Sequence, residues 1–162
     1  MTRVVIVGGG FAGLNCAKVL GGTPDVDVTL VDRRNHHLFQ PLLYQVAMAG
    51  LSPADVAAPI RTLVSRHANI RVLMAALQTV DVARRVAVTD AGELPFDYLV
   101  LACGASHSYF GHDEWAPYAP GLKTLDDALE IRRRILLAYE AAEREADAAR
   151  QRRLLTFVIV GG

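Results

Sequence analysis

The order of hydrophobic and polar positions predicts strands and helices that alternate along the chain. Residues 4–7 are uninterrupted apolar residues, which is typical of a buried parallel strand. A helix is predicted from Phe11 to about Leu20, and two glycines follow it, as glycine commonly follows a helix. Residues 26–32 alternate and predict a second strand. Together they form a strand–helix–strand unit of about 30 residues, the usual length of a parallel crossover.

The middle of the chain predicts shorter elements. Residues 33–51 read as a long irregular stretch, and Ser52-Pro53-Ala54-Asp55 then has the pattern of a helix start. Pro59 makes that helix short or kinked, because proline cannot donate a helical hydrogen bond. Further strands are predicted at residues 70–75, at residues 98–102 (buried), and as hairpin strands at residues 80–88 with a turn at residues 90–93.

The clearest helix begins at Thr124. Asp127 follows three residues later, and the two form a capping pair. Apolar residues then recur at helical spacings, at Leu125, Leu129, Leu136 and Tyr139. This helix is predicted to end near Arg150, and a last strand is predicted at residues 154–160.

An apolar strand that runs into glycines occurs twice, at residues 4–9 and at residues 157–162. Such a strand is how a parallel sheet enters a phosphate-binding turn, so the repeat predicts two nucleotide-binding turns. The second copy stops at Gly162, before its turn is complete. The repeat therefore predicts that the chain is truncated within a second nucleotide-binding domain.

The first copy continues into a glycine-rich turn, Gly8-Gly9-Gly10-Phe11-Ala12-Gly13, which satisfies G-x-G-x-x-G. Gly8 permits the sharp turn, Gly10 lets a pyrophosphate approach the backbone, and Gly13 allows close packing of helix on strand. The unpaired amides at the helix start attract phosphates. Because glycine turns also serve purely structural ends, the pattern is weak by itself, and its position between a strand and a helix strengthens it.

An acidic residue at the end of the second strand adds to this pattern. Asp32 comes 19 residues after Gly13, close to the spacing of about 20 residues expected for a ribose-binding carboxylate. A carboxylate accepts hydrogen bonds from ribose hydroxyls and repels a 2′-phosphate, so NADP is disfavoured. Arg33 and Arg34 weaken that exclusion slightly. The turn alone does not separate FAD from NAD.

Composition and charge exclude some classes of function. The formal net charge is zero, so no excess of positive charge indicates binding to nucleic acid or an acidic membrane surface. The hydrophobic share of 52% is at or slightly above that of ordinary globular proteins. No apolar stretch approaches the roughly 20 residues of a membrane helix, and the start of the chain lacks a signal-peptide core. Cys16 and Cys103 form no CxxC, which indicates two buried thiols in a reducing cytoplasm.

Three further stretches carry a resemblance to a known family. They are His36-His37-Leu38-Phe39-Gln40-Pro41-Leu42-Leu43-Tyr44-Gln45, Phe96-Asp97-Tyr98-Leu99-Val100-Leu101-Ala102-Cys103-Gly104-Ala105, and His107-Ser108-Tyr109-Phe110-Gly111-His112. With the glycine phrases, they resemble type II NADH dehydrogenase, the non-proton-pumping NADH:quinone oxidoreductase of the FAD/NAD(P)-binding pyridine nucleotide-disulfide oxidoreductase superfamily. The similarity covers essentially the whole chain.

This resemblance implies a Rossmann-like α/β fold with a parallel sheet, flanking helices and a small antiparallel hairpin layer. Residues 1–112 would be the incomplete N-terminal part of a FAD-binding domain. Residues 113–162 would be a connecting helix and the first strand of a truncated NAD-binding domain. The cofactor would be noncovalent FAD, and the parent protein would pass a hydride from NADH to FAD and then electrons to a membrane quinone.

The resemblance also assigns site residues. Gly8, Gly9, Gly10, Phe11, Ala12 and Gly13 would hold the FAD pyrophosphate, Asp32 the adenosine ribose with Arg33 beside it, and the backbone at Leu77 the adenine. Ala102, Cys103 and Gly104 match a segment where the chain passes close to the cofactor. Cys103 replaces the usual threonine of that family, which removes a hydroxyl. No catalytic acid–base pair is nominated, because the chemistry belongs to the cofactor, and the spacing of the histidines fits no metal site.

The parent protein would be a peripheral protein on the cytoplasmic face of the inner membrane, held there by C-terminal helices beyond this chain, and a homodimer stays open. The 162 residues alone are expected to lack NADH:quinone activity. Two alternatives remain: a non-catalytic FAD-binding fragment, and a related flavoprotein with another electron acceptor, similar to ferredoxin reductases. Flavin disulfide reductases and sulfide:quinone reductases are set aside, because residues 41–50 contain no cysteine and neither thiol is suitably placed.

Overall fold

A computed structural model of the chain describes residues 1–161. Two compact units can be distinguished by their internal contacts. The first contains residues 1–39 and 57–106, and the second contains residues 40–56 and the chain from His107 onward. The first unit holds every sheet of the described chain, and the second holds its longest helix.

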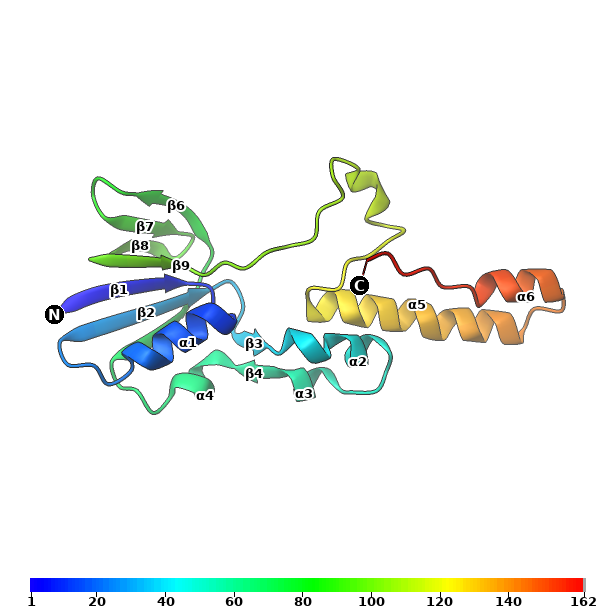
Figure 1. The fold of residues 1–162 in the computed structure, drawn as a ribbon, viewed down its shortest axis with the longest axis horizontal. Helices are drawn as coiled ribbons and strands as arrows, with labels where there is room; N and C mark the ends of the chain where they lie inside the picture. Colours follow the sequence, from blue (N-terminus) through cyan, green and yellow to red (C-terminus); the bar gives the residue numbers. More distant parts are fainter. Residues whose placement is uncertain (162) are drawn as a thin grey trace. The chain divides into compact units, whose positions relative to one another are not determined.

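A four-stranded parallel sheet forms the centre of the first unit (Figure 1). Its order is β5 (Ile70–Met74), β2 (Val26–Asp32), β1 (Thr2–Val7) and β9 (Tyr98–Leu101). Helix α1 (Phe11–Leu20) connects β1 to β2 and completes the predicted crossover. The prediction of an α/β fold with a parallel sheet is confirmed.

The uninterrupted apolar run in β1 is explained by burial of both faces of the sheet. On one face, a core cluster packs under α1 and contains Val4, Ile6, Ala17, Val28, Leu30 and Ile60. On the other face, a second cluster contains Val5, Val7, Val31, Ala75, Ala87 and Phe96. Because successive side chains of a strand point to opposite faces, a strand buried on both sides needs apolar residues at every position.

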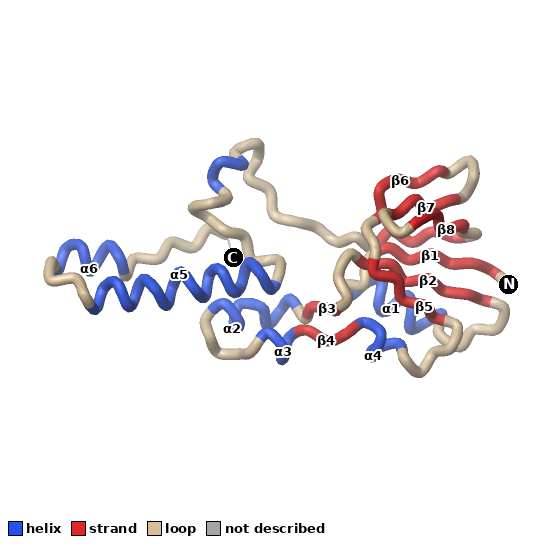
Figure 2. Tube along the Cα trace, turned by 180° about the vertical axis from the view of Figure 1, so that it is seen from behind, coloured by secondary structure: helices blue, strands red, loops and turns tan. Residues whose placement is uncertain are grey.

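The second cluster is covered by a small antiparallel sheet of β6 (Leu77–Asp81), β7 (Val86–Thr89) and β8 (Gly92–Pro95), drawn in Figure 2. The hairpin layer was therefore predicted, but residues 80–88 are not one strand. They contain the end of β6, a turn and the start of β7, and Arg85 in that turn has φ +53°. Apolar alternation on both sides of the turn hid it in the sequence.

Residues 33–51, predicted as irregular, contain regular elements. The short strand β3 (His36–Leu38) pairs antiparallel with β4 (Ala57–Pro59), and helix α4 (Ile60–Val64) follows directly. Pro59 lies in β4 and not in a helix, so the helix that starts at Pro53 is short, as predicted. The pairing joins segments about 20 residues apart, which no local pattern shows.

The second unit is built around α5 (Leu125–Glu143). Thr124 and Asp127 form the predicted capping box, with each side chain accepting a backbone N–H of the other. Helix α2 (Leu43–Ala47) packs on α5 and is preceded by the 3₁₀ turn η1 (Gln40–Leu42). The other helical elements of this unit are α3 (Pro53–Val56), η2 (Asp113–Trp115) and α6 (Ala148–Leu154).

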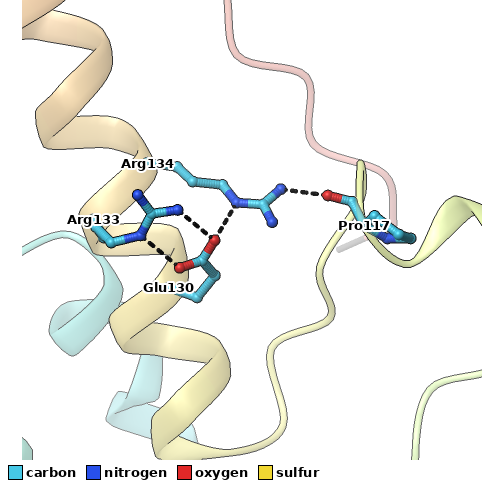
Figure 3. A network of polar contacts seen from close by, with 4 residues as sticks. All are labelled: Pro117, Glu130, Arg133 and Arg134. Carbon is cyan, nitrogen blue, oxygen red and sulfur yellow. Dashed lines mark hydrogen bonds and ion pairs between the residues drawn. The ribbon is translucent and has the colours of Figure 1, made fainter.

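An ionic network ties α5 to the loop before it (Figure 3). Glu130 accepts hydrogen bonds from Arg133 and Arg134, and Arg134 also donates to the carbonyl oxygen of Pro117 at 2.7 Å. Hydrogen bonds from the two guanidinium groups lower the pKa of the Glu130 carboxyl to about 2. Arg134, oriented by Glu130, therefore joins the helix to the loop.

Three predictions near the chain's end and at the sheet edge are wrong. The long helix ends at Glu143 and not near Arg150, because Asp147 caps a separate helix, α6. Residues 155–161 form no strand; Val160 is 92% exposed, since no neighbouring strand covers it. Strand β9 is not buried, because it lies at the edge of the sheet and Tyr98 is 65% exposed. Gly162, the last glycine of the second copy, lies outside the described residues.

Candidate functional site

The candidate site lies where three parallel strands end at one edge of the sheet. β1 leads into the glycine turn at Gly8, β2 ends at Asp32, and β9 leads into Ala102. From β1 the chain proceeds to β2 and β5 on one side, while β9 lies on the other side. In parallel sheets, ligands bind outside the carboxyl ends of the strands, at the point where the strand order reverses. That point lies between β1 and β9.

Gly8 and Gly13 are required by contacts between backbones. Gly8 has φ +107°, and a Cβ there would overlap the carbonyl group of Ala102, 2.7 Å from its carbon. A Cβ at Gly13 would overlap the carbonyl oxygen of Gly8. Ala102 is itself fixed, since its N–H donates to the carbonyl of Val7 at 2.7 Å. The turn is therefore packed between the helix start and the segment after β9.

Gly9, which the motif leaves unspecified, is held through both its N–H and its carbonyl. Its N–H donates to Oδ2 of Asp32 at 2.6 Å, and its carbonyl accepts a hydrogen bond from Nδ1 of His37 at 2.9 Å. A Cβ at this position would lie 2.6 Å from Cδ1 of Ile60. Glycine at position 9 thus allows the main chain to lie against α4.

The carboxylate of Asp32 is held by main-chain groups. Oδ2 accepts from Gly9, and Oδ1 accepts from the N–H of Arg34 at 2.7 Å. Each carboxylate oxygen has two lone pairs, so both retain capacity for a ligand hydroxyl. Arg33, beside it, is exposed to solvent. The side chain is thus oriented in advance at the end of β2.

Gly10 differs from its neighbours because it faces open space. It is exposed, and a Cβ built on it would meet no atom within 4 Å. Within residues 1–161, no acceptor is recorded for the N–H groups of Gly10, Phe11, Ala12 and Gly13. Four such groups at the positive end of a ten-residue helix make a site for an anion. The residues present therefore fit the diphosphate of a dinucleotide.

Aromatic rings surround one side of the turn. The ring of Phe11 meets that of His37 edge-on at 5.0 Å between centroids, and that of Phe39 at 5.6 Å. Phe11 and Phe39 are 45% and 43% exposed, so each presents a partly open face. Edge-to-face packing of this kind fixes ring orientation.

The remaining predicted residues fall into two groups. Cys103 and Gly104 follow Ala102 and are exposed; Gly104 has φ +72°, and Sγ of Cys103 lies 3.9 Å from the Val7 carbonyl oxygen. Leu77 begins β6, and its side chain packs against the second core cluster. The expectation of two buried thiols is wrong, because Cys103 is exposed and Cys16 is only half-buried.

Comparison with known proteins identifies the family. The family described as pyridine nucleotide-disulphide oxidoreductase matches residues 2–162. The chain belongs to the pyridine nucleotide-disulphide oxidoreductase family. Two relatives from Mycobacterium tuberculosis, the type II NADH:quinone oxidoreductases NdhA and Ndh, are 50% and 48% identical over 98% of this chain, which covers 34% and 35% of their lengths. This member of the family is thus a homologue of type II NADH:quinone oxidoreductases, and it spans about a third of the curated relatives' length.

A solved structure gives the same result for the fold. NDH2 from Plasmodium falciparum in complex with NADH is 25% identical, with a TM-score of 0.80 over 94% of this chain and 32% of that chain. The Rossmann-like fold expected for the family is confirmed. No helix among the described residues of this family member is long and apolar enough to cross a membrane. Within residues 1–161, no group of three or more His, Cys, Asp or Glu side chains could hold a metal ion.

Sequence reasoning missed His37, Ile60 and the role of Gly9. His37 was read only as one of several loop histidines, yet the pairing of β3 with β4 places it against the turn of this pyridine nucleotide-disulphide oxidoreductase. The pairing is non-local, and a single sequence carries no signal for it. A hint existed for Gly9 alone, because a third glycine in a G-x-G motif suggests a crowded position.

Proposed function

We propose that the chain is the FAD-binding part of a type II NADH:quinone oxidoreductase. The observation that carries this proposal is the row of N–H groups from Gly10 to Gly13, for which no acceptor is recorded within residues 1–161. Gly10, at the start of this row, faces open space, and Gly9 before it is bonded to Asp32. Sequence identity of 50% to an NADH:quinone oxidoreductase over 98% of the chain supports the same function.

The glycine turn and the acidic residue would bind different parts of FAD. The N–H groups of Gly10 to Gly13 would donate to the diphosphate, and the helix dipole of α1 would favour its charge. Asp32 would accept hydrogen bonds from the adenosine ribose, as proposed from the sequence. Arg33 beside it, the backbone at Leu77 and the segment from Ala102 to Gly104 complete the proposed contacts. Phe11 and Ala12 contribute through their backbone.

FAD, when bound, supplies the redox chemistry, because it can take up a hydride and release electrons singly or in pairs. Since the chain spans about a third of its curated relatives' length, electron transfer from NADH to a quinone is proposed for a protein of the relatives' length. FAD binding is proposed for these 162 residues. Attachment of the longer protein to a membrane surface belongs to the same proposal.

The test is a titration of the 162-residue chain with FAD, followed by gel filtration. Wild-type protein should retain a flavin spectrum, and Gly10→Ala should lose affinity while its unfolding curve is unchanged, because the added methyl group occupies only the anion's approach. Asn15→Ala, at an exposed position of the same helix, is the matched control and should bind as wild type does. Absence of flavin from the wild-type fraction would contradict the proposal.

A different electron acceptor is the alternative to a quinone. The relatives at 48–50% identity are NADH:quinone oxidoreductases, which favours the quinone. NADH-dependent reduction of a short-chain quinone and of a ferredoxin can be compared in a protein of the relatives' length. Faster reduction of the ferredoxin would favour the alternative.

A further inference from the structure

The two peptide groups that flank Gly9 are each held by one side chain. The peptide before it is fixed by the hydrogen bond from its N–H to Asp32 at 2.6 Å. The peptide after it is fixed by the hydrogen bond from His37 Nδ1 to its carbonyl at 2.9 Å. The sequence motif includes Asp32 but gives no role to His37.

The second contact controls a group that faces the anion site. A peptide unit is planar and trans, so the carbonyl of Gly9 and the N–H of Gly10 point in opposite directions within one rigid plane. When His37 holds the carbonyl, the N–H of Gly10 must point to the opposite side. No acceptor for that N–H is recorded within residues 1–161. Without His37, rotation of this plane can turn a carbonyl oxygen toward a bound anion.

The position of His37 is itself determined by its surroundings. Strand pairing places His37 opposite Ala58, and the N–H of Ile60 donates to the carbonyl of Asn35 beside the pair. The imidazole ring meets Phe11 edge-on, with an angle of 88° between planes. Because a carbonyl only accepts, Nδ1 must carry the proton in this arrangement.

We propose that His37 is a positioning residue for the diphosphate site: its Nδ1–H locks the Gly9–Gly10 peptide so that Gly10 presents its N–H to the diphosphate of a dinucleotide. This inference rests on the proposed FAD binding and adds a residue to it. His37 acts through the main chain and makes no contact with the ligand.

The test compares three variants of the 162-residue chain by FAD titration and by urea unfolding. His37→Ala removes the donor and should raise the Kd for FAD about threefold to tenfold, the value of one hydrogen bond. His37→Asn places an amide N–H close to the position of Nδ1 and should bind within about twofold of wild type. His36→Ala is the matched control, because His36 contacts Asn35 and not the turn.

Ligands that carry less of the cofactor locate the effect. ADP, which retains the diphosphate, should lose as much affinity as FAD in His37→Ala, while adenosine should lose none. Equal losses for adenosine, or an equal weakening in His37→Asn and His37→Ala, would overturn the inference. Unchanged FAD affinity in His37→Ala would overturn it and leave the proposed function standing. A wild-type chain that binds no FAD would overturn both.

A second measurement needs no variant. Long-range ¹H–¹⁵N correlation spectra report which imidazole nitrogen carries the proton. A proton on Nδ1 of His37 is expected, and a proton on Nε2 alone would overturn the inference even if His37→Ala fails to fold.

Discussion

Substitution of Gly9 by alanine tests whether Ile60 closes the space beside the glycine turn. The new Cβ would lie 2.6 Å from Cδ1 of Ile60 and 3.3 Å from Oδ2 of Asp32. Ile60 is fully buried in the core cluster under α1, so its side chain has little room to move. Overpacking of this kind costs about 1–3 kcal/mol. Alanine also lowers the conformational entropy of the unfolded chain, which stabilises the folded state by about 0.4–1 kcal/mol and offsets part of this cost.

We therefore expect Gly9→Ala to lower the free energy of unfolding by about 1–2 kcal/mol in urea denaturation followed by circular dichroism. Ile60→Val removes only Cδ1, the clashing atom, and alone should cost about 0.5–1.5 kcal/mol. In the double variant the clash is absent. The double variant should therefore lose about 1–2 kcal/mol less free energy of unfolding than the two single variants lose together.

Gly10→Ala is the matched control for this cycle, because a Cβ there meets nothing within 4 Å. Its unfolding curve should stay within about 0.5 kcal/mol of wild type. The reasoning is refuted if Gly9→Ala and Ile60→Val are additive to within about 0.3–0.5 kcal/mol, the scatter seen for independent sites.

Three further properties can be measured on the same chain. Hydrogen bonds from Arg3 lower the pKa of Asp97 to about 2. The stabilisation that this pair gives the folded state is therefore complete above the usual pKa of 3.8 and is lost as the pH falls toward 2. Between these pH values, Asp97→Asn should lose less free energy of unfolding than wild type. Thr124→Ala removes a helix cap and should cost about 1 kcal/mol in urea unfolding, whereas Thr124→Ser should retain most of it. Exposed Cys103 should react with a thiol reagent before half-buried Cys16, and saturating FAD should slow only the first reaction; no slowing would place Cys103 outside the cofactor site.

The elements that the sequence predicted well depend on local chemistry. β1, α1 and β2 follow from an apolar run, a glycine turn and a second run within the first 32 residues. The cap at Thr124 follows from two side chains three residues apart. In each case the interactions that decide the structure lie within one turn or one strand.

The elements that it missed depend on distant partners. β3 exists because it pairs with β4, and residues 155–161 lack strand structure because no strand among residues 1–161 pairs with them. The same distinction holds at the candidate site. Gly8, Gly10 and Gly13 were assigned from spacing, whereas the contacts of Gly9 come from Asp32, His37 and Ile60, which reach it only through the fold.

The close approach of Ala102 to Gly8 has a consequence for the order of events during synthesis. The Arg3–Asp97 ion pair, which lies at the opposite ends of the same two strands, joins residues 94 apart in sequence. A ribosome that adds about 5–20 residues per second needs roughly 5–20 s to cover that distance. The glycine turn is therefore synthesised early, but Ala102, which packs against Gly8, is added only after β9. The proposed binding of a dinucleotide would therefore follow the synthesis of β9.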